Sequence, residues 1–434
     1  MEPKSSAWRA IGPGVLYAGA AIGVSHLVQS TRAGALYGLS LVAVVVLAHV
    51  FKYPAMRVGP QYAAATGASL VVGYRRRGRW ALALFAILTL GTMFIIQAAV
   101  TFITASLVRL GAGSLGLPTN TWWMSTWFVA LGLLTLCAGL LAIGGYRWLD
   151  RCLKALMVAM VVVTLLAAAT QVPVLFNEGV PILPDLSAWG VAEIAFVAVL
   201  VGWMPAPLDI AAWQSIWSLE RDLVIRRRCS RRESRLDFHV GYALCVVTAL
   251  AFLVLGAGVM HTRGVTPANG SIGFVAQIVS LYTDAIGEWV RPIVLLGALA
   301  IMLSTTITVL DAIPRTLVAI GHAARATEPP PRSRLKYWIA LVVLGAGAQG
   351  VICYTLFRDA GAWRWLIDLA TTLAFLSTPL LAWLNHLAWT GREVPPEHRP
   401  GTSMRVFSWV CIGVWLVFAG VWVVYAWPWS GGTT

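Results

Sequence analysis

The sequence predicts an all-α polytopic membrane protein, on three observations: its composition, a series of long apolar segments, and the placement of its basic residues. Of the 434 residues, 59% are hydrophobic and only 12% are charged. A soluble globular protein carries about 25% charged residues. So few charges cannot cover a globule of this size with groups that face water. A soluble enzyme, a disordered chain and a disulfide-stabilised scaffold are therefore excluded.

Eleven segments are long and apolar enough to cross a bilayer, because a hydrocarbon core of about 30 Å requires roughly 20 residues of α-helix. No long polar stretch separates them, which indicates a single membrane transport domain over residues 1–434 without a soluble appendage. The predicted spans are 11–31, 36–56, 81–108, 122–145, 152–172, 189–217, 238–260, 288–312, 335–357, 363–388 and 404–427.

The basic residues indicate the orientation of these spans. The net charge is +14, from 32 Lys and Arg against 18 Asp and Glu. Most basic clusters, such as RRRGR at 75–79 and the segment 221–235, fall on one side of the alternating spans. Cytoplasmic loops carry such an excess, so we expect the N-terminus in the cytoplasm and, after an odd number of spans, the C-terminus outside. We expect an integral protein of a bacterial inner (plasma) membrane, with the lipid bilayer as its surroundings, no nucleic-acid partner and no obligate protein partner.

Two of the spans resist a continuous helix. The first reads GPGVLYAGAAIGVSHLVQSTRAG, where Gly19 and Gly23 lower the barrier to unwinding. The sixth carries Pro205 and Pro207 at mid-span, and each proline costs about 3 kcal/mol or more in a helix interior. Irregular backbone at membrane depth is tolerated only where it faces protein or an aqueous cavity.

Two interrupted helices that lie five spans apart are typical of inverted-repeat transporters, whose broken helices meet at the midplane and offer free backbone groups to a solute. The sequence therefore predicts a LeuT-type 5+5 inverted repeat, with repeat one at 11–172, repeat two at 189–388 and an extra helix at 404–427. The sequence contains no HExxH, Walker A or nucleophile-elbow motif, so we expect a transporter and not an enzyme, and no cofactor.

The interrupted helices also carry a family resemblance. The segment GPGVLYAGAAIGVSHLVQSTRAGALYG resembles the first span of the NRAMP (natural resistance-associated macrophage protein) divalent-metal/proton symporters, and Met204-Pro205 falls on the Met-Pro of their sixth. Three further segments resemble their seventh, eighth and tenth helices, namely ESRLDFHVGYALCVVTALAFLVLGAG, LSTTIT at 303–308 and TLAFLSTPLLAWLNH at 372–386. The resemblance covers most of the chain and implies the LeuT-type fold and a transport function.

The metal site of that family is not retained, so the chain resembles an atypical branch of it. In register with the family's Asp-Pro-Gly-Asn motif stand Gly23, Val24, Ser25 and His26. The two histidines that follow the family's Met-Pro are replaced by alanine, at Ala206 and Ala211, and the third span contains no acid. A hard or borderline dication in so dry a site needs at least one carboxylate. We therefore expect a secondary active transporter that is not a standard Mn/Fe-proton symporter.

The altered break suggests a different cargo. If the first helix unwinds near Gly23, its second half begins with free N–H groups and a positive dipole end, which favour a carboxylate. Amino-acid transporters of this fold use a glycine-rich break for this purpose, so we expect a small solute that is carboxylate-bearing or amino-acid-like. The predicted solute-binding residues are Gly19, Gly23, Ser25, His26, Trp203, Met204 and Ala206.

The coupling ion stays open between a proton and sodium. His26 and Asp209 are the candidates for a proton, and the Thr305 and Thr306 hydroxyls are the candidates for sodium. The alternative cargo is a divalent or soft transition-metal ion at a remodelled site of His26, Met204 and Asp209, since thioether and imidazole suit softer ions. Lys52, near the inner end of its predicted span, is expected to extend to the membrane interface.

Overall fold

The fold was obtained as a computed structural model, which describes residues 12–143, 147–185, 187, 189–325, 334–358 and 361–425. These residues form helices joined by loops, with no β-strand among them. Nine helices in these ranges are long and apolar enough to cross a membrane. They are α3 (Val42–Met56) continued by α4 (Val58–Thr66), α6 (Arg79–Ser114), α7 (Thr126–Ile143), α8 (Arg147–Asn177), α11 (Arg231–Gly256), α13 (Arg291–Arg325), α14 (Arg334–Arg358), α15 (Ala362–Trp389) and α16 (Thr402–Tyr425).

Two further spans are broken at mid-length, as the sequence predicted. Helix 1 consists of α1 (Pro13–Ala21), a turn at residues 22–23, a π-helical segment η2 (Ser25–Ser30) and α2 (Thr31–Tyr37). Helix 6 consists of α9 (Val191–Gly202), irregular backbone at 203–209, and α10 (Ile210–Ile225). With the nine continuous helices these account for the eleven predicted spans, and the LeuT-type fold class is confirmed.

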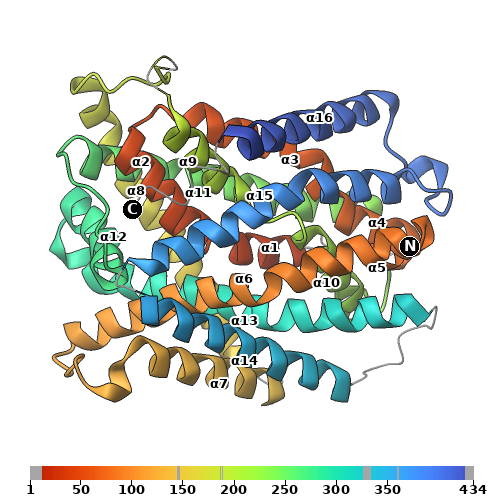
Figure 1. Cartoon of the computed structure of the whole chain (residues 1–434), viewed down its shortest axis with the longest axis horizontal. Helices are drawn as coiled ribbons and strands as arrows, with labels where there is room; N and C mark the ends of the chain where they lie inside the picture. Colours follow the sequence, from red (N-terminus) through yellow and green to blue (C-terminus); the bar gives the residue numbers. More distant parts are fainter. Residues whose placement is uncertain are drawn as a thin grey trace, which may run out of the picture.

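The spans run along the long axis of the molecule, with the two breaks near its middle. Figure 1 shows α2 and α9 toward the end that carries α12 (Ser271–Ile286), and α4, α10 and α5 (Leu70–Arg77) toward the opposite end. Helix α12 is not among the spans predicted from the sequence, because its 16 residues are too few to cross a bilayer. The boundaries of the two repeats stay a prediction.

Small residues set the distance between the broken helices and their neighbours. A Cβ built at Gly14 of α1 would lie 2.0 Å from the Asp237 carbonyl oxygen, and one at Gly241 would lie 2.2 Å from the Gly14 carbonyl oxygen. The backbones of α1 and α11 therefore touch, and no side chain fits between them. Glycine contacts of this kind are the usual way for membrane helices to approach closely. As a result, helix 1 lies directly along α11, with α13 and α10 on its other sides.

Candidate functional site

A small cavity lies where the two breaks meet. It has a free volume of about 30 Å³, which is room for one or two water molecules. Its wall is mostly apolar. Helix 1 contributes Ala20, Ala21, Val24 and Ser25, helix 6 contributes Trp203, Ala206, Pro207, Ile210 and Trp213, and the helices α6 and α13 contribute Ile96, Val100, Thr305 and Val309.

The structure places four of the predicted residues in this wall, namely Ser25, Trp203, Ala206 and Thr305. Gly19 and Gly23 lie against α13 beside it. The Gly19 carbonyl oxygen accepts a hydrogen bond from the Thr305 hydroxyl at 3.0 Å, and a Cβ on Gly23 would lie 2.7 Å from the same hydroxyl oxygen. The glycines thus allow helix 1 to turn directly over α13, and they bring main-chain carbonyls to the cavity edge.

His26 is fully buried and faces α11. Its Nε2 lies 2.9 Å from the Cys245 carbonyl oxygen, and its Nδ1 lies 2.8 Å from the Ala21 carbonyl oxygen and 2.7 Å from the Ser25 hydroxyl. A carbonyl can only accept, so a ring with both nitrogens protonated satisfies both carbonyls, whereas a neutral ring carries one N–H. The Ser25 hydroxyl itself donates to the Ala21 carbonyl, so its single proton reaches a neutral Nδ1 only if the hydroxyl turns away from that carbonyl. The protonation state of His26 is therefore linked to the direction of the Ser25 hydroxyl beside the break of helix 1.

Met204 and Asp209 do not join His26 in a ligand cluster. Met204 is fully buried in a separate apolar cluster with residues of α3, α9 and α15, such as Val45 and Phe375. Asp209 precedes α10 and is about nine-tenths buried, and its Oδ1 has no hydrogen-bond partner among the described residues. Within those residues no group of three or more His, Cys, Asp or Glu side chains lies close enough together to hold a metal ion.

The two threonines of α13 point in different directions. The Thr305 hydroxyl lies between the Gly19 carbonyl and the Ile301 carbonyl of its own helix, at 3.0 and 2.9 Å. The Thr306 hydroxyl lies 2.8 Å from the Thr104 hydroxyl on α6 and 2.8 Å from the Met302 carbonyl. Their oxygens do not converge on one point, and both bond back to their own helix, as threonines in membrane helices commonly do.

Lys52 is a residue of the site that the sequence analysis missed. The expectation that it extends to the membrane interface is wrong, because its side chain is fully buried. Its ammonium group reaches across from α3 to helix 6 and donates to carbonyl oxygens on both sides of the break, those of Val201, Gly202 and Ala206. A signal was present in the sequence, since a lone lysine in an apolar span must find buried partners unless it reaches water.

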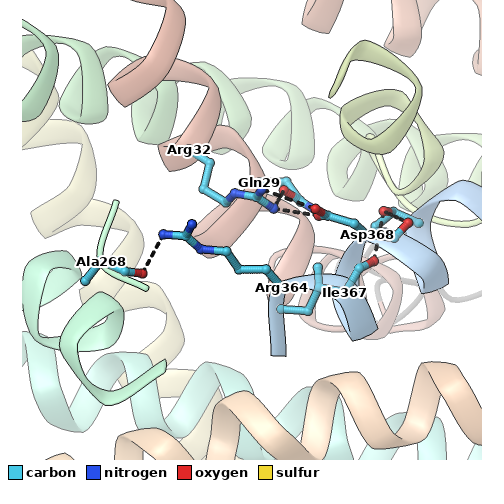
Figure 2. Close-up of polar contacts among 7 residues, drawn as sticks. Gln29, Arg32, Ala268, Arg364, Ile367 and Asp368 are labelled. Atoms are coloured by element: carbon cyan, nitrogen blue, oxygen red, sulfur yellow. Dashed lines mark hydrogen bonds and ion pairs between the residues drawn. The ribbon is translucent and has the colours of Figure 1, made fainter. Parts of the chain in front are cut away.

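An ion pair joins α2 to α15 toward the end of the molecule that carries α12 (Figure 1). Arg32 of α2 donates to the Asp368 carboxylate of α15 at 2.6 Å, and also to the Gln29 side-chain oxygen at 3.0 Å. One turn earlier on α15, Arg364 donates at 2.7 Å to the carbonyl of Ala268, which lies in the segment before α12. Figure 2 shows the two arginines side by side, with Arg32 directed at Asp368 and Arg364 at Ala268. These contacts join α2, α15 and the segment before α12.

A carboxylate binds the opposite end of helix 1. Asp237, near the start of α11, accepts hydrogen bonds from the Gly12 and Gly14 main-chain N–H groups at 2.8 and 2.7 Å. These N–H groups form the N-terminus of α1, where the helix dipole also favours a negative charge. Helix 1 is thus bonded to Asp237 at its N-terminal end and, through Arg32 of α2, to Asp368 at its other end, with its break and the cavity between them.

The fold and the paired breaks define the class: this is an integral membrane protein of the LeuT-type fold. No protein-family model matches the chain. It is 34% identical over 385 residues to Uncharacterized protein PM0681 of Pasteurella multocida (strain Pm70), an alignment that covers 88% of this chain and 84% of that protein. The chain belongs to the same family as PM0681.

Two solved structures share the fold at low sequence identity. A manganese transporter of Eremococcus coleocola, in complex with an aromatic bis-isothiourea substituted compound, superposes with a TM-score of 0.69 and 14% identity over 99% of this chain and 88% of that one. MhsT in complex with L-phenylalanine superposes with a TM-score of 0.68 and 14% identity over 95% and 98% of the two chains. The same fold therefore occurs in a protein named for a metal ion and in one crystallised with an amino acid.

Proposed function

We propose that this protein is a secondary active transporter of an atypical NRAMP-like branch that carries a small organic solute through the cavity between the breaks of helices 1 and 6. The solute is carboxylate-bearing or amino-acid-like, and transport proceeds by alternating access in a bacterial inner membrane, with the N-terminus in the cytoplasm. Two closures at opposite ends of helix 1, one on each side of a central cavity, support this mechanism, because each can open while the other holds.

The observation that carries the choice of solute is a concentration of unsatisfied polar atoms at the helix 6 break. Within the described structure, hydrogen-bond partners are missing for Trp203 Nε1, Asp209 Oδ1, Trp213 Nε1 and both side-chain polar atoms of Gln214, and all of these atoms are buried. Buried polar groups are nearly always hydrogen-bonded, so such a set requires an explanation. Trp203 and Trp213 both line the cavity. Their indole N–H groups can only donate, so they suit a solute that presents an acceptor oxygen.

The alternative metal cargo has less support. The described His, Cys, Asp and Glu residues form no metal-ligand cluster, and Met204 lies outside the cavity wall. The ammonium group of Lys52 bonds to the carbonyl oxygen of Ala206, a residue of that wall, at 3.1 Å. A fixed positive charge next to the cavity opposes a dication and favours an anionic group.

For the driving ion we propose the proton, bound at His26. The carbonyls of Ala21 and Cys245 favour the doubly protonated ring. The neutral ring is satisfied when the Ser25 hydroxyl turns its proton from the Ala21 carbonyl to Nδ1. His49 of α3 is the other titratable ring close enough to His26 to interact with it electrostatically. Sodium is the less supported ion, because the hydroxyls of Thr305 and Thr306 face different neighbours.

Trp203→Phe tests the solute proposal, since it keeps an aromatic ring in the cavity wall but removes the indole N–H. The probes are the standard L-amino acids and short carboxylates, and binding to the purified protein is measured by thermal shift. A hydrogen bond to a charged group contributes about 1.5 kcal/mol or more, so we expect roughly tenfold weaker binding of any solute that binds the wild type.

The matched control is Trp122→Phe, in a short 3-10 turn, η3 (Trp122–Met124), where the side chain is 70% exposed. It should bind like the wild type. Equal binding by wild type and Trp203→Phe would show that the indole N–H does not contact the solute.

A further inference from the structure

We propose that Lys52 is a built-in cation: its ammonium group occupies a cation-binding site formed by main-chain carbonyl oxygens at the break of helix 6. The three N–H bonds of the ammonium group are matched by three acceptors, the carbonyls of Val201 at 2.7 Å, Gly202 at 2.7 Å and Ala206 at 3.1 Å. A lysine ammonium group has three donors and no acceptor. Three carbonyls around one nitrogen therefore satisfy it completely.

The surroundings of the ammonium group are those of a cation site. Val201 and Gly202 are the last residues of α9, where the helix dipole places partial negative charge. The Trp415 ring of α16 lies 5.7 Å from the ammonium nitrogen, a distance at which the negative ring face attracts a cation. Asp209, on the far side of the break, attracts the ammonium charge, and His49 on α3 is also close enough to interact with it.

The carbonyl oxygens at the break also depend on the Lys52 ammonium group for a hydrogen-bond donor. Unwinding at 203–209 leaves the Gly202 carbonyl without an intrahelical donor, whereas the Val201 carbonyl still accepts from the Met204 N–H at 3.2 Å. Buried carbonyls without a donor are costly. Lys52 donates to both carbonyls from a neighbouring helix and joins the end of α9 to Ala206 within the break. The break is thereby held open in one conformation without an ion from solution. If the lysine charge is removed, the carbonyls form a vacant site for a small monovalent cation.

Thermal unfolding of the purified protein in detergent tests this inference and needs no knowledge of the solute. Lys52→Met keeps the length of the apolar stem and removes the charge, while Lys52→Ala removes the stem as well and leaves space for an ion. Lys336→Met, an exposed lysine at the start of α14, is the matched control. Each variant is measured in choline chloride and, at the same ionic strength, in ammonium, methylammonium, sodium and potassium chloride.

In choline we expect Tm to fall by roughly 5 °C in Lys52→Met and Lys52→Ala, because the Gly202 and Ala206 carbonyls lose their donor and the Val201 carbonyl keeps only the Met204 N–H. The Tm of Lys336→Met should stay unchanged. In Lys52→Ala, at least one of the small cations should recover about half of this loss, whereas the Tm of the wild type should not respond to the choice of cation. A Tm in Lys52→Met equal to that of the wild type would overturn the proposal. So would a destabilised Lys52→Ala that responds to none of the four cations. If Lys52→Ala is not recovered as folded protein, the comparison of Lys52→Met with the wild type decides alone.

Discussion

Replacing His26 with glutamine is expected to abolish the dependence of solute uptake on a proton gradient. The glutamine amide can still donate to the Cys245 carbonyl, which His26 Nε2 contacts at 2.9 Å, but it cannot bind or release a proton near neutral pH. Coupling that uses this ring should therefore be lost and not merely shifted along the pH axis. In proteoliposomes with acid outside, accumulation should fall at least tenfold, to the level seen without a gradient.

The control for this experiment is His386→Gln. His386 is also buried, but it bonds to Ser408 between α15 and α16, away from the break of helix 1. It should retain the stimulation by external acid. Acid-stimulated uptake of normal size in His26→Gln would assign proton coupling elsewhere, with Asp209 as the next residue to test by Asp209→Asn.

Replacing Asp237 with alanine is expected to open the inner end of helix 1. The substitution removes the acceptor for the Gly12 and Gly14 N–H groups, now bonded at 2.8 and 2.7 Å. Leaving the buried Gly14 N–H unpaired costs about 1–3 kcal/mol, and the part-buried Gly12 N–H adds a smaller cost. The closed conformation should therefore lose roughly 3 kcal/mol against an open one in which water solvates both groups. At 1.4 kcal/mol per factor of ten, this shifts the closed-to-open ratio by about 100-fold.

The shift can be measured as the labelling rate of a cysteine placed in the cavity wall, Ala20→Cys, in a chain from which the other cysteines have been removed. We expect much faster modification from the cytoplasmic side in the Asp237→Ala background. Glu233→Ala, which removes a carboxylate one turn earlier on α11 where it pairs with Arg227 at the surface, should leave the rate unchanged. If Ala20→Cys is labelled at the same rate with neither further substitution, with Asp237→Ala and with Glu233→Ala, then Asp237 does not hold the N-terminal end of helix 1 closed.

The breaks were predictable because their causes are local. Pro205 and Pro207 cannot continue a helix wherever they stand in space, and the glycines of the first span lower its helical stability in the same way. The position of Lys52 was not predictable in this manner. The predicted span 36–56 placed it near an end, but the helix continues through α4 to Thr66, so Lys52 lies at the depth of the helix 6 break.

The partners across the fold could not be inferred from spacing. Arg32 and Asp368 are 336 residues apart in the chain, and nothing in either segment specifies the other. The same holds for Asp237 and the amides of Gly12 and Gly14. By contrast, the pair of Asp311 and Arg315 follows from four-residue helical spacing, and the structure places their charged groups 2.7 Å apart. The direction of His26 toward α11 depends on the π-helical turn after the break, which the composition of the segment does not reveal.

Manganese entry into proteoliposomes loaded with a metal-quenched dye, measured beside a manganese-transporting NRAMP protein as control, distinguishes an organic cargo from a metal ion. We expect no Mn²⁺ entry above that of empty liposomes, and, in the same preparation, uptake of at least one radiolabelled amino acid or short carboxylate. Saturable Mn²⁺ entry that is lost in a combined His26→Ala and Met204→Ala variant would contradict the account, because it would show that these two side chains form a metal path in spite of their separate surroundings.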